Sequence, residues 1–510
     1  MTDQGSNSSP AGAVAASLDA DVIVIGAGPA GMSAAIELGA SGFRVITLDM
    51  NMSPGGQIYR SLELNLGGQR ADPVLTRALG NAYAAGLPLV ARFRQQEGID
   101  YRPDTTVWEL RTDGTVGWQR AGRGGYLRAR YIVLANGAME RPMPFPGWTL
   151  PGVMTAGAVQ TLIKSSRLKP AGEVILAGTG PLLFLLADQL VKLGVKPALI
   201  ARTDGLGDKL RAMTLLRPTA IPAIAKGVGW MRNLRKAGIR TVTGVVRLEA
   251  LGGDRVREVV VEAGDRITRL PCDTLIVHDG IIPSTDLAQC AGLAVKWRAD
   301  DGSWLPVTDQ SGLASPSGGA NFSVGPNRIW ITGDARLIGG ADAAAAHGRH
   351  VGQMLAARLQ TGARETPAAG PGKVYARAMA PRAFIDTAFP QGQTSVHLDD
   401  ATIVCRCEEI TAGSIRENAR QGATDADQLR GLLRCGMGPC QGRSCASTIA
   451  RLLSEEFALA HPPRPFRGRP PVRPVPLGIL ATLESLDANL VSSEALNDKP
   501  DASGGSDADV

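Results

Sequence analysis

Aromatic residues are scarce in this sequence, long hydrophobic runs are absent, and neither sign of charge dominates. Phe, Trp and Tyr make up 4% of the 510 residues, and the formal net charge is +6 over 54 basic and 48 acidic side chains. No long basic run alternates with aromatic residues, which argues against nucleic-acid binding. The most apolar stretch, around Leu182 to Leu190, contains Asp188 and is too short for a transmembrane segment.

Cysteine is scarce outside one segment. Two of the seven cysteines, Cys272 and Cys290, are scattered, whereas five lie between positions 405 and 445. A secreted disulfide framework would be spread more widely, so the pattern indicates a reducing compartment and a metal site. Residues 1–20 carry no Lys or Arg and lack a continuous apolar core, which argues against a secretion signal. We therefore expect a cytoplasmic protein, with peripheral attachment to a membrane as the alternative.

Glycine, by contrast, is abundant, and the first glycine-rich motif begins at Asp21 with the sequence DVIVIGAGPAG. Its β-branched residues predict a buried strand, Gly26 permits a tight turn, Gly28 lets the backbone approach a pyrophosphate, and Gly31 allows the next helix to pack closely. A second strand ends at Asp49, where a carboxylate can accept both ribose hydroxyls. The motif thus predicts a dinucleotide site formed by Gly26, Gly28, Pro29, Ala30, Gly31 and Asp49.

Three later segments also suggest contacts with a nucleotide. Gly56 and Gln57 lie in a turn whose backbone could lie against a flat ligand, although an ordinary turn is the simpler interpretation. A buried strand ends at Gly137, which is the pattern expected where a chain re-enters a sheet beside a bound nucleotide. A late strand ends at Gly333-Asp334, where the carboxylate either caps a helix or lies under the middle of an extended cofactor.

The plan of strand, glycines, helix and strand repeats imperfectly between residues 173 and 201. Gly178 and Gly180 are present, but Leu183 replaces the third glycine and the second strand runs into Arg202 without an immediate acid. One interpretation is a second adenine nucleotide, NAD(P) or ATP, with Arg202 suited to a 2′-phosphate. The other is a duplicated fold that no longer holds a hydride carrier.

The clustered cysteines form a C-x-C and a C-x₄-C pair separated by two predicted helices. Four thiolates suffice for a [2Fe–2S] cluster, in which each iron needs two sulfur ligands. Zinc is the main competitor, but the C-x-C spacing is less usual for zinc, and we favour iron and sulfur. Cys435 is a fifth thiol that could replace a ligand. The predicted ligands are Cys405, Cys407, Cys440 and Cys445.

These residues resemble the flavoproteins with two dinucleotide-binding domains, in which an FAD domain is split by an inserted NAD-type domain. The resemblance implies an α/β fold with two Rossmann-like domains of the glutathione-reductase type, and FAD as the cofactor at the first loop. It also implies that Asp49 is the ribose acid, that the backbone of Val107 meets the adenine, and that Gly333-Asp334 binds the ribityl chain.

Longer motifs resemble the A-type subunits of opine oxidases, hydrogen cyanide synthase, and the hydroxyproline and proline dehydrogenase complexes. The cysteine segment resembles the bacterioferritin-associated ferredoxin domain, which implies the same four ligands. At Asn136 the chain departs from the family, which usually has Thr there. The motifs are Pro54–Arg60, Glu140–Gly157 and Val404–Glu409.

The resemblance implies an electron-transfer subunit of a complex that oxidises the C–N bond of an amino acid, imino acid or opine. Its partners would be an amine-oxidase-like FAD catalytic subunit, a downstream electron acceptor and a small ferredoxin-like [2Fe–2S] subunit. No constellation of catalytic acid/base residues is recognisable near the nucleotide motifs. The alternatives are a self-contained NAD(P)H-dependent flavin oxidoreductase and a non-catalytic scaffold stabilised by its nucleotide and metal.

The order of the motifs predicts the domain boundaries. A disordered lead-in and a Pro/Arg-rich, then acidic, disordered tail enclose the folded region, although the Pro/Arg segment could instead lie extended along a partner. The predicted regions are the lead-in (1–19), the first segment of the FAD-binding domain (20–155), the NAD-type domain (156–272), the second segment of the FAD-binding domain (273–360), a linker (361–400), the [2Fe–2S] domain (401–456) and the tail (457–510).

Overall fold

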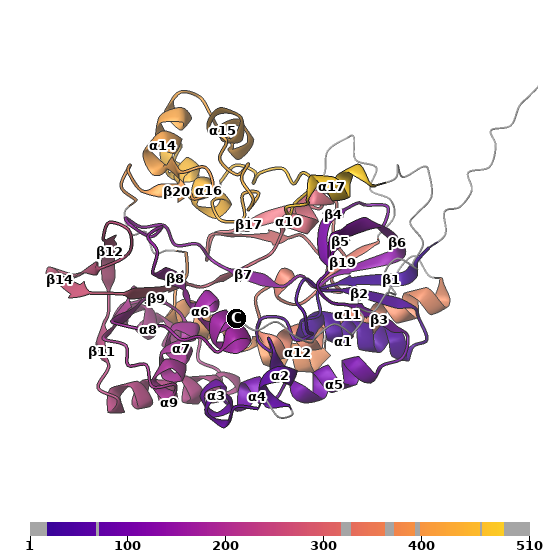
Figure 1. Ribbon diagram of the computed structural model, residues 1–510, viewed down its shortest axis with the longest axis horizontal. Coiled ribbons are helices and arrows are strands. Elements are labelled where there is room, and N and C mark those ends of the chain that lie inside the picture. Colours follow the sequence, from indigo (N-terminus) through magenta and orange to yellow (C-terminus); the bar gives the residue numbers. More distant parts are fainter. Residues whose placement is uncertain are drawn as a thin grey trace, which may run out of the picture.

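The computed structural model describes residues 18–67, 71–317, 328–362, 372–392, 398–459 and 462–483. Two α/β halves lie side by side, and a small helical module lies against both of them (Figure 1). The predicted fold class, two Rossmann-like cores followed by a small helical domain, is confirmed. No helix within the described ranges is long and apolar enough to cross a membrane.

The first half is built on a seven-stranded sheet in which β1 lies between β2 and β6 with parallel pairing. Helices cover one face and the β4–β5 hairpin covers the other, so β1 and β2 are buried almost throughout. The strands are β1 (Ala20–Ile25), β2 (Val45–Leu48), β3 (Ile99–Arg102), β4 (Thr106–Leu110), β5 (Thr115–Arg120), β6 (Arg123–Leu134) and β19 (Ile329–Ile331).

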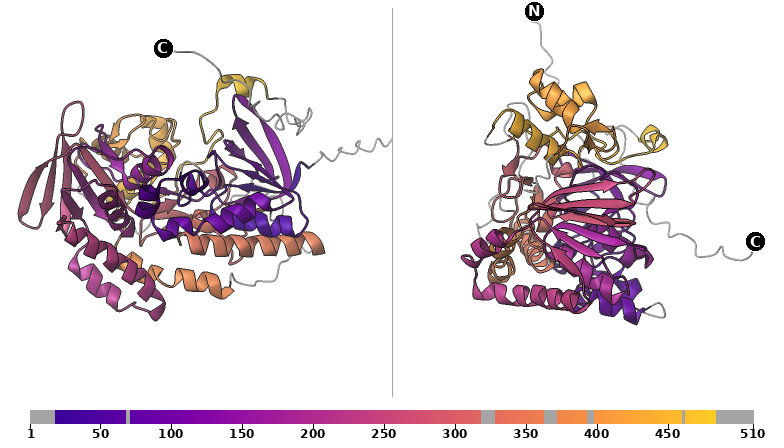
Figure 2. Two further views of the ribbon diagram at one scale, coloured as in Figure 1. Left: turned by 60° about the horizontal axis from the view of Figure 1, so that its bottom comes forward. Right: turned by 90° about the vertical axis from the view of Figure 1, so that its left-hand side faces the viewer.

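Helix α1 (Pro29–Ala40) packs along the late helix α11 (Ala341–Thr361), and the left view of Figure 2 shows α11 beneath this half. A Cβ atom at Gly348 would lie 2.0 Å from the carbonyl oxygen of Ala30, and one at Gly352 would lie 2.7 Å from that of Ala34. Glycine is therefore required at both positions of α11. This close packing fixes the start of α1, where the first glycine loop ends.

The second half contains a five-stranded parallel sheet and a three-stranded antiparallel sheet. Helix α7 begins directly after β9, as α1 does after β1. The elements are β8 (Val153–Thr155), α6 (Ala156–Ser166), β9 (Val174–Thr179), α7 (Pro181–Lys192), β10 (Leu199–Arg202), α8 (Leu206–Met213), α9 (Ile221–Lys236), β11 (Arg240–Val242), β12 (Val245–Leu251), β13 (Glu258–Ala263), β14 (Arg266–Pro271) and β15 (Thr274–Asp279).

The predicted boundaries of the inserted domain are wrong at both ends. Strand β15 pairs with β8 and β9, so it belongs to the second sheet and not to the flavin half. Strand β8 likewise starts three residues before the predicted boundary at residue 156. A short buried strand has the same apolar sequence pattern in either sheet, so the sequence of β15 did not reveal the strands with which it pairs.

Short elements connect the two halves and complete the helical layers. Three helices follow one another between Pro73 and Gln95, with Gly80 between the first two. The predicted linker contains two helices, α12 and α13. These elements are α2 (Leu62–Leu66), α3 (Pro73–Leu79), α4 (Asn81–Ala84), α5 (Leu87–Gln95), β7 (Ala138–Glu140), η2 (Pro218–Ala220), β16 (Ile281–Pro283), α10 (Asp286–Cys290), β17 (Val295–Arg298), β18 (Ser303–Pro306), η3 (Gly333–Ala335), α12 (Gly372–Met379) and α13 (Arg382–Ala388).

The helical module has its own apolar core, which contains Ile415, Leu429 and Ile449. It is joined to the rest of the chain by a hydrogen bond of 2.7 Å from the indole Nε1 of Trp148 to the carbonyl oxygen of Ile403. Its elements are β20 (Ile403–Cys405), β21 (Ile410–Thr411), α14 (Ala412–Arg420), α15 (Ala426–Leu433) and α16 (Ala446–Glu456).

Residues 462–483, here called the C-terminal strap, run from the module back to the first half and end in α17 (Leu477–Ala481) (Figure 1). Phe466 is buried in the module core, and the backbone N–H of Val472 donates to the carbonyl oxygen of Trp108 at 2.9 Å. The predicted disorder of the tail is therefore wrong for the strap, because a few apolar anchors suffice to hold it in place. The lead-in up to residue 17 and the acidic residues 484–510 lie outside the described ranges.

Candidate functional site

The first glycine loop, between β1 and α1, has the geometry that its sequence predicts. Gly26 has a φ of +106°, and a Cβ atom at Gly31 would lie 1.8 Å from the carbonyl oxygen of Gly26. A Cβ atom at Gly28 would make only an ordinary contact, 3.8 Å from the Cα of Gly56, so the loop is less crowded there than at Gly31. The first turn of α1 has Pro29 at its start, no acidic side chain and no side-chain cap. Its N–H groups and dipole are therefore suited to an anion.

Asp49 follows β2 and is almost fully buried. Its carboxylate accepts the backbone N–H of Ala27 at 2.5 Å and both the backbone and side-chain N–H groups of Asn51 at 2.7 Å. Burial nevertheless raises the pKa of Asp49 above its ordinary value. Asp49 forms no ion pair within the described residues, so its remaining lone pairs are free to accept ribose hydroxyls.

The segment containing Gly56 and Gln57 lies directly on this loop. A Cβ atom at Gly56 would lie 2.9 Å from the Cα of Gly28, and the carbonyl oxygen of Gln57 accepts a hydrogen bond from the Nζ of Lys164 at 3.0 Å. Lys164 belongs to α6 of the second half and also donates to Ile58. Burial lowers its pKa to about 8. A buried lysine, whose position no sequence pattern indicated, therefore ties the second half to the predicted flavin loop.

The late pair Gly333-Asp334 also reaches the first loop. A Cβ atom at Gly333 would lie 2.6 Å from the Cβ of Ala30. Oδ1 of Asp334 accepts the backbone N–H groups of Gly339 and Gly340 at 2.8 and 3.1 Å, ahead of α11. Within the described residues no hydrogen bond engages Oδ2, so a helix-capping role and a contact with a cofactor are compatible.

Two further predicted contacts lie in the same half. Val107 is in β4, where the pairing with β5 shifts register between Val107 and Glu109, and such a bulge leaves backbone groups unpaired. Gly137 follows β6 with a φ of +68°. Ser284 donates its N–H to the carbonyl oxygen of Gly137 and accepts the side-chain amide of Asn136, both at 3.0 Å. These bonds connect the end of β6 to the wall of a cavity described below.

The second glycine loop, between β9 and α7, has the same tight turn as the first loop but is more crowded at its second glycine. A Cβ atom at Gly178 would lie 1.9 Å from the carbonyl oxygen of His278, and one at Gly180 would lie 3.2 Å from the imidazole of the same residue. Leu183, which replaces the third glycine, is fully buried in the core. His278 also contacts Glu140, with Nδ1 and Oε1 2.5 Å apart.

An acid does approach the second loop, but it comes from a later position than expected. Asp204 lies two residues after β10 and accepts the hydroxyl of Thr179 at 3.2 Å, as Asp49 accepts the N–H of Ala27. Its carboxylate is paired with Arg202 and, at 2.8 Å, with the Nζ of Lys209. The expected acid was sought at the end of β10, and Asp204 was missed because it lies two residues beyond that end. The sequence Arg202-x-Asp204 was the signal that could have identified it.

The structure brings the four predicted cysteine ligands together as two pairs. The thiol of Cys445 donates to Cys405, which lowers the pKa of Cys405 to about 6, and Cys407 contacts Cys440. Backbone N–H groups, including that of Gly436, also donate to Cys405. Within the described residues no three metal-ligating side chains converge on a single ion position. Two pairs of thiols are compatible with the two irons of a [2Fe–2S] cluster, in which each iron takes two sulfur ligands.

The remaining cysteines lie in apolar surroundings. Burial raises the pKa of Cys435 to about 12 and that of Cys272 to about 12, and burial also raises the pKa of Cys290. A raised pKa does not separate Cys435 from the predicted ligands, because the hydrogen bond to Cys405 and burial also raise the pKa of Cys445 well above its ordinary value. Cys435 lies beside Cys405 and Cys445, and the four ligands stay those that the cysteine spacing predicts.

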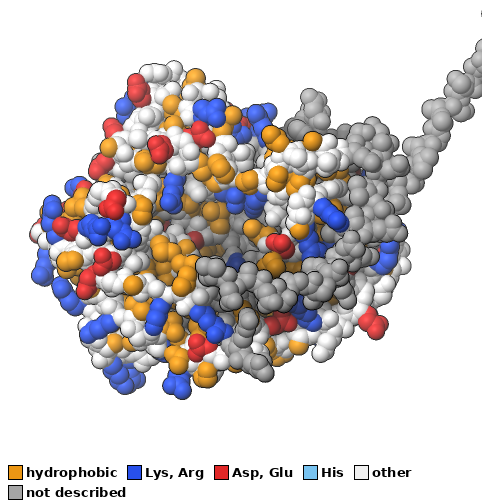
Figure 3. Space-filling view, in the orientation of Figure 1, with side chains coloured by type: hydrophobic (Ala, Val, Ile, Leu, Met, Phe, Trp, Pro, Cys, Tyr) orange, Lys and Arg blue, Asp and Glu red, His pale blue; other side chains and the backbone are white. Residues whose placement is uncertain are grey.

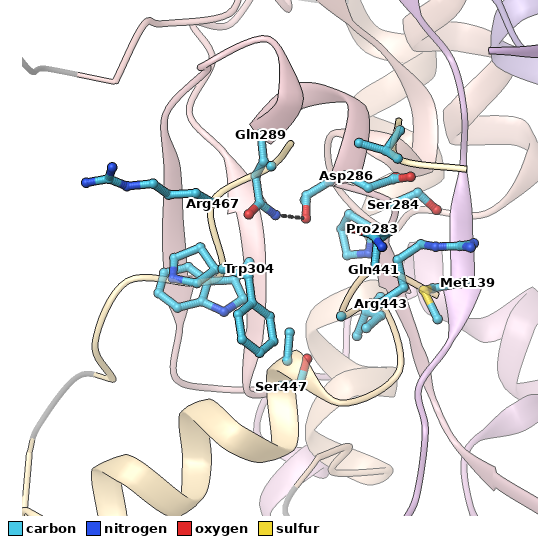
Figure 4. Close-up of a pocket in the computed structure, with 18 of the residues that line it drawn as sticks. Met139, Pro283, Ser284, Asp286, Gln289, Trp304, Gln441, Arg443, Ser447 and Arg467 are labelled. Carbon is cyan, nitrogen blue, oxygen red and sulfur yellow. Dashed lines mark hydrogen bonds between the residues drawn. The ribbon is translucent and has the colours of Figure 1, made fainter. Parts of the chain in front are cut away.

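One cavity is shared by the flavin half, the module and the C-terminal strap (Figure 4). Met139, two residues after Gly137, lines one wall, and Gln441, directly after Cys440, lines another. Arginine side chains give the cavity a positive charge. Its labelled lining residues are Met139, Pro283, Ser284, Asp286, Gln289, Trp304, Gln441, Arg443, Ser447 and Arg467.

Two family models match the chain. Residues 20–348 match the pyridine nucleotide-disulphide oxidoreductase model, and residues 403–455 match the BFD-like [2Fe-2S] binding domain. The first model covers the region with both glycine loops, and the second covers the four cysteines that form pairs. A flavin-type redox fold and an iron–sulfur-binding module therefore occur in one chain.

Curated relatives match over nearly the whole length. The opine oxidase A subunit of Agrobacterium tumefaciens is 38% identical, with 91% of this chain and 92% of the relative covered. The HcnB subunit of hydrogen cyanide synthase from Pseudomonas aeruginosa is 32% identical, with 90% and 98% covered. L-proline dehydrogenase from P. horikoshii shares the fold, with a TM-score of 0.62, 20% identity, and 90% and 79% covered. The chain therefore belongs to the family of opine oxidase A subunits, within the pyridine nucleotide-disulphide oxidoreductases.

Proposed function

We propose that this chain is the FAD- and [2Fe–2S]-containing electron-transfer subunit of a complex that oxidises the C–N bond of an amino acid, an imino acid or an opine. The observation that carries the proposal is the shared cavity. Its walls contain the neighbours of Gly137, a predicted flavin contact, and of Cys440, a predicted cluster ligand. Because these neighbours share one cavity, the arrangement supports electron transfer between the two predicted redox sites within the chain.

The residues of the chain fit the two cofactors. The first glycine loop, Asp49 and Asp334 would hold the FAD, and the four paired cysteines would hold the cluster. FAD with an iron–sulfur cluster accepts electrons as a pair and releases them singly. The guanidinium of Arg443 lies near Cys440 and Cys407 and offsets the negative charge of their thiolates.

The proposal assigns oxidation of the substrate to a partner. We expect the catalytic partner to be an amine-oxidase-like FAD subunit, accompanied by a small ferredoxin-like [2Fe–2S] subunit, with a separate electron acceptor. The names of the relatives support this expectation, because the opine oxidase A and hydrogen cyanide synthase HcnB chains are subunits of larger enzymes. For the second loop we propose a duplicated fold without a hydride carrier, because Leu183 is buried and Asp204 is paired with two cations.

Anaerobic titration separates this proposal from an NAD(P)H-dependent reductase. The purified chain should keep its flavin oxidised in the presence of stoichiometric NADH or NADPH, whereas the assembled complex should bleach when an opine or amino-acid substrate is added. Rapid bleaching of the isolated chain by either nicotinamide cofactor would instead establish the reductase. A colourless protein without a reduced [2Fe–2S] signal in electron paramagnetic resonance would favour a scaffold.

A matched pair of cysteine variants tests the cluster ligands. Cys445→Ser should abolish the reduced [2Fe–2S] signal and the bound iron while retaining the flavin. Cys435→Ser, a change of equal size beside the site, should retain both signals because Cys435 lies outside the C-x-C and C-x₄-C pairs that supply the predicted ligands. Loss of the cluster in Cys435→Ser with retention in Cys445→Ser would refute the ligand set.

A further inference from the structure

One segment of the second half carries positive charge without any compensating acid. Between Asp208 and Glu249 the chain contains nine Lys and Arg residues and no Asp or Glu. These nine charges exceed the formal net charge of +6 of the whole chain, so the remainder of the protein is net acidic. The excess positive charge of this protein is thus concentrated in the segment that contains most of α8, all of α9 and β11.

The exposed surface of this segment is also apolar. Along α8, Leu206, Leu210 and Met213 recur on one face and are 74%, 63% and 57% exposed. Another side of the helix packs on α13, and the Nζ of Lys209 lies 3.4 Å from the centre of the ring of Phe389, which follows α13. A surface helix normally turns its polar side outward, whereas α8 exposes three large apolar side chains.

The apolar surface continues through the connection into α9. Leu215 and Leu216 are exposed in the connection, and Ile221 and Val228 lie on the outer side of α9. Blue and orange side chains lie side by side along the lower left edge of Figure 3, where Figure 1 places α9. We call this surface the α8–α9 face. Its apolar members are Leu206, Leu210, Met213, Leu215, Leu216, Ile221 and Val228.

Lys209 and Arg247 of this segment form ion pairs, but five other cations around the apolar side chains form none in the part of the chain that the structure describes. Within the described residues, no ion pair engages the exposed Arg211, Arg217, Lys226, Arg232 or Arg235. Unpaired cations bordering an exposed apolar surface attract a partner that is both anionic and apolar at its boundary. A bilayer containing anionic lipids meets both requirements.

We infer that the α8–α9 face attaches the protein peripherally to the surface of an anionic membrane. The leucines and Met213 would enter the boundary between headgroups and acyl chains, and the surrounding Lys and Arg would contact lipid phosphates. A protein partner fits this face less well, because protein interfaces favour aromatic residues, whereas none of the apolar members of this face is aromatic. The inference rests on this surface and is independent of the proposed electron transfer.

Flotation of the full-length chain with lipid vesicles tests the inference. The chain should bind vesicles of equal parts phosphatidylglycerol and phosphatidylcholine, should not bind pure phosphatidylcholine, and should dissociate as salt is raised. The triple variant Arg217→Gln, Lys226→Gln and Arg232→Gln should weaken this binding roughly a hundredfold, because each basic residue near an anionic surface contributes comparably. Leu210→Glu should weaken it as well.

Ile267→Glu is the matched control, because Ile267 is 64% exposed on β14, outside the α8–α9 face, and the change is of the same kind. It should bind vesicles like the unmodified chain, and flavin absorbance and thermal melting verify that each variant is folded. Failure of the unmodified chain to bind anionic vesicles, or equal binding by the triple variant, overturns the inference. Loss of a co-purifying partner subunit in the triple variant, with vesicle binding unchanged, would identify the face as a protein interface instead.

Discussion

The two glycine loops begin alike and end differently. Both follow a buried strand, both turn at a glycine with positive φ, and both lead into a helix with proline at its start. In the first loop, Gly31 lets α1 approach the strand and Asp49 forms no ion pair within the described residues. In the second, Leu183 fills the core and Asp204 is paired with two cations.

The difference shows that a shared backbone plan is not sufficient for a nucleotide site. A ribose hydroxyl needs an acceptor that the protein has not already saturated, and Asp204 is saturated whereas Asp49 is not. The imidazole of His278 also lies close beside Gly180, whereas the first loop is less crowded at Gly28. The first loop thus retains the features of a binding site, and the second retains those of a structural core.

The largest expected effect on flavin binding comes from filling the first loop. Gly31→Ala places a Cβ atom 1.8 Å from the carbonyl oxygen of Gly26, so it should lower the free energy of unfolding by about 3 kcal/mol and abolish flavin binding. Gly28→Ala meets its nearest atom at 3.8 Å, and it should fold normally yet lose flavin. Chemical denaturation and the ratio of flavin to protein measure both effects. Equal destabilisation by the two changes would contradict this assignment.

Restoring the third glycine in the second loop should cost stability without creating a site. Leu183→Gly removes a fully buried side chain from a helix, which should lower the free energy of unfolding by about 4 kcal/mol. Because Asp204 stays paired, the variant should still not bind NADH in equilibrium dialysis. Leu210→Gly is the control, since this exposed helical leucine should lose only about 1 kcal/mol. New NADH binding by Leu183→Gly would show that Leu183 alone blocks the site.

Lys164 links the two regions and gives stability a pH dependence. Burial lowers its pKa from 10.5 to about 8, so between these values the unfolded chain binds more protons than the folded one. Stability should therefore rise from about pH 8 to about pH 10.5, by at most about 3 kcal/mol from this residue. Below pH 8 the lysine is protonated in both states and the rise is absent. Denaturation of Lys164→Met should lack this rise, whereas the exposed Lys169→Met should keep it.

The smallest expected effects come from the two acids. Asp204→Asn weakens pairs with Arg202 and Lys209, both partly exposed, and should lower the free energy of unfolding by about 1 to 2 kcal/mol without changing the flavin content. Asp49→Asn should weaken flavin binding as its main effect and should change the free energy of unfolding less. Urea denaturation and flavin titration measure the pair of variants. Flavin loss in Asp204→Asn would show that the two halves are coupled more tightly than this comparison implies.

Local motifs predicted much of this molecule. Strand β1, its glycines and Asp49 lie close together in the sequence, and local spacing determines how they meet. Cys405 and Cys445 are distant from each other, yet the short spacing within each cysteine motif was sufficient to identify them as candidate ligands. In each case the chemistry of the site is encoded by neighbouring residues in the sequence.

Features that depend on distant contacts were not predictable in this way. Lys164 reaches a loop more than one hundred residues away, and nothing in its helix distinguishes it from an exposed lysine. Strand β15 has the same apolar pattern as the strands of the other sheet, so only its pairing reveals its position. The C-terminal strap has the composition of a disordered tail, and Phe466 becomes an anchor because the module offers it a core.

The packing of α1 against α11 has a consequence for the order of events during synthesis. The second sheet is complete once β15 has emerged from the ribosome, but the first sheet still lacks β19, and α1 still lacks the helix that packs on Ala30 and Ala34. The second half can therefore fold before the first half, whose sequence continues after it, has been completely synthesised. We therefore expect flavin to bind late, after Gly348 and Gly352 have been translated.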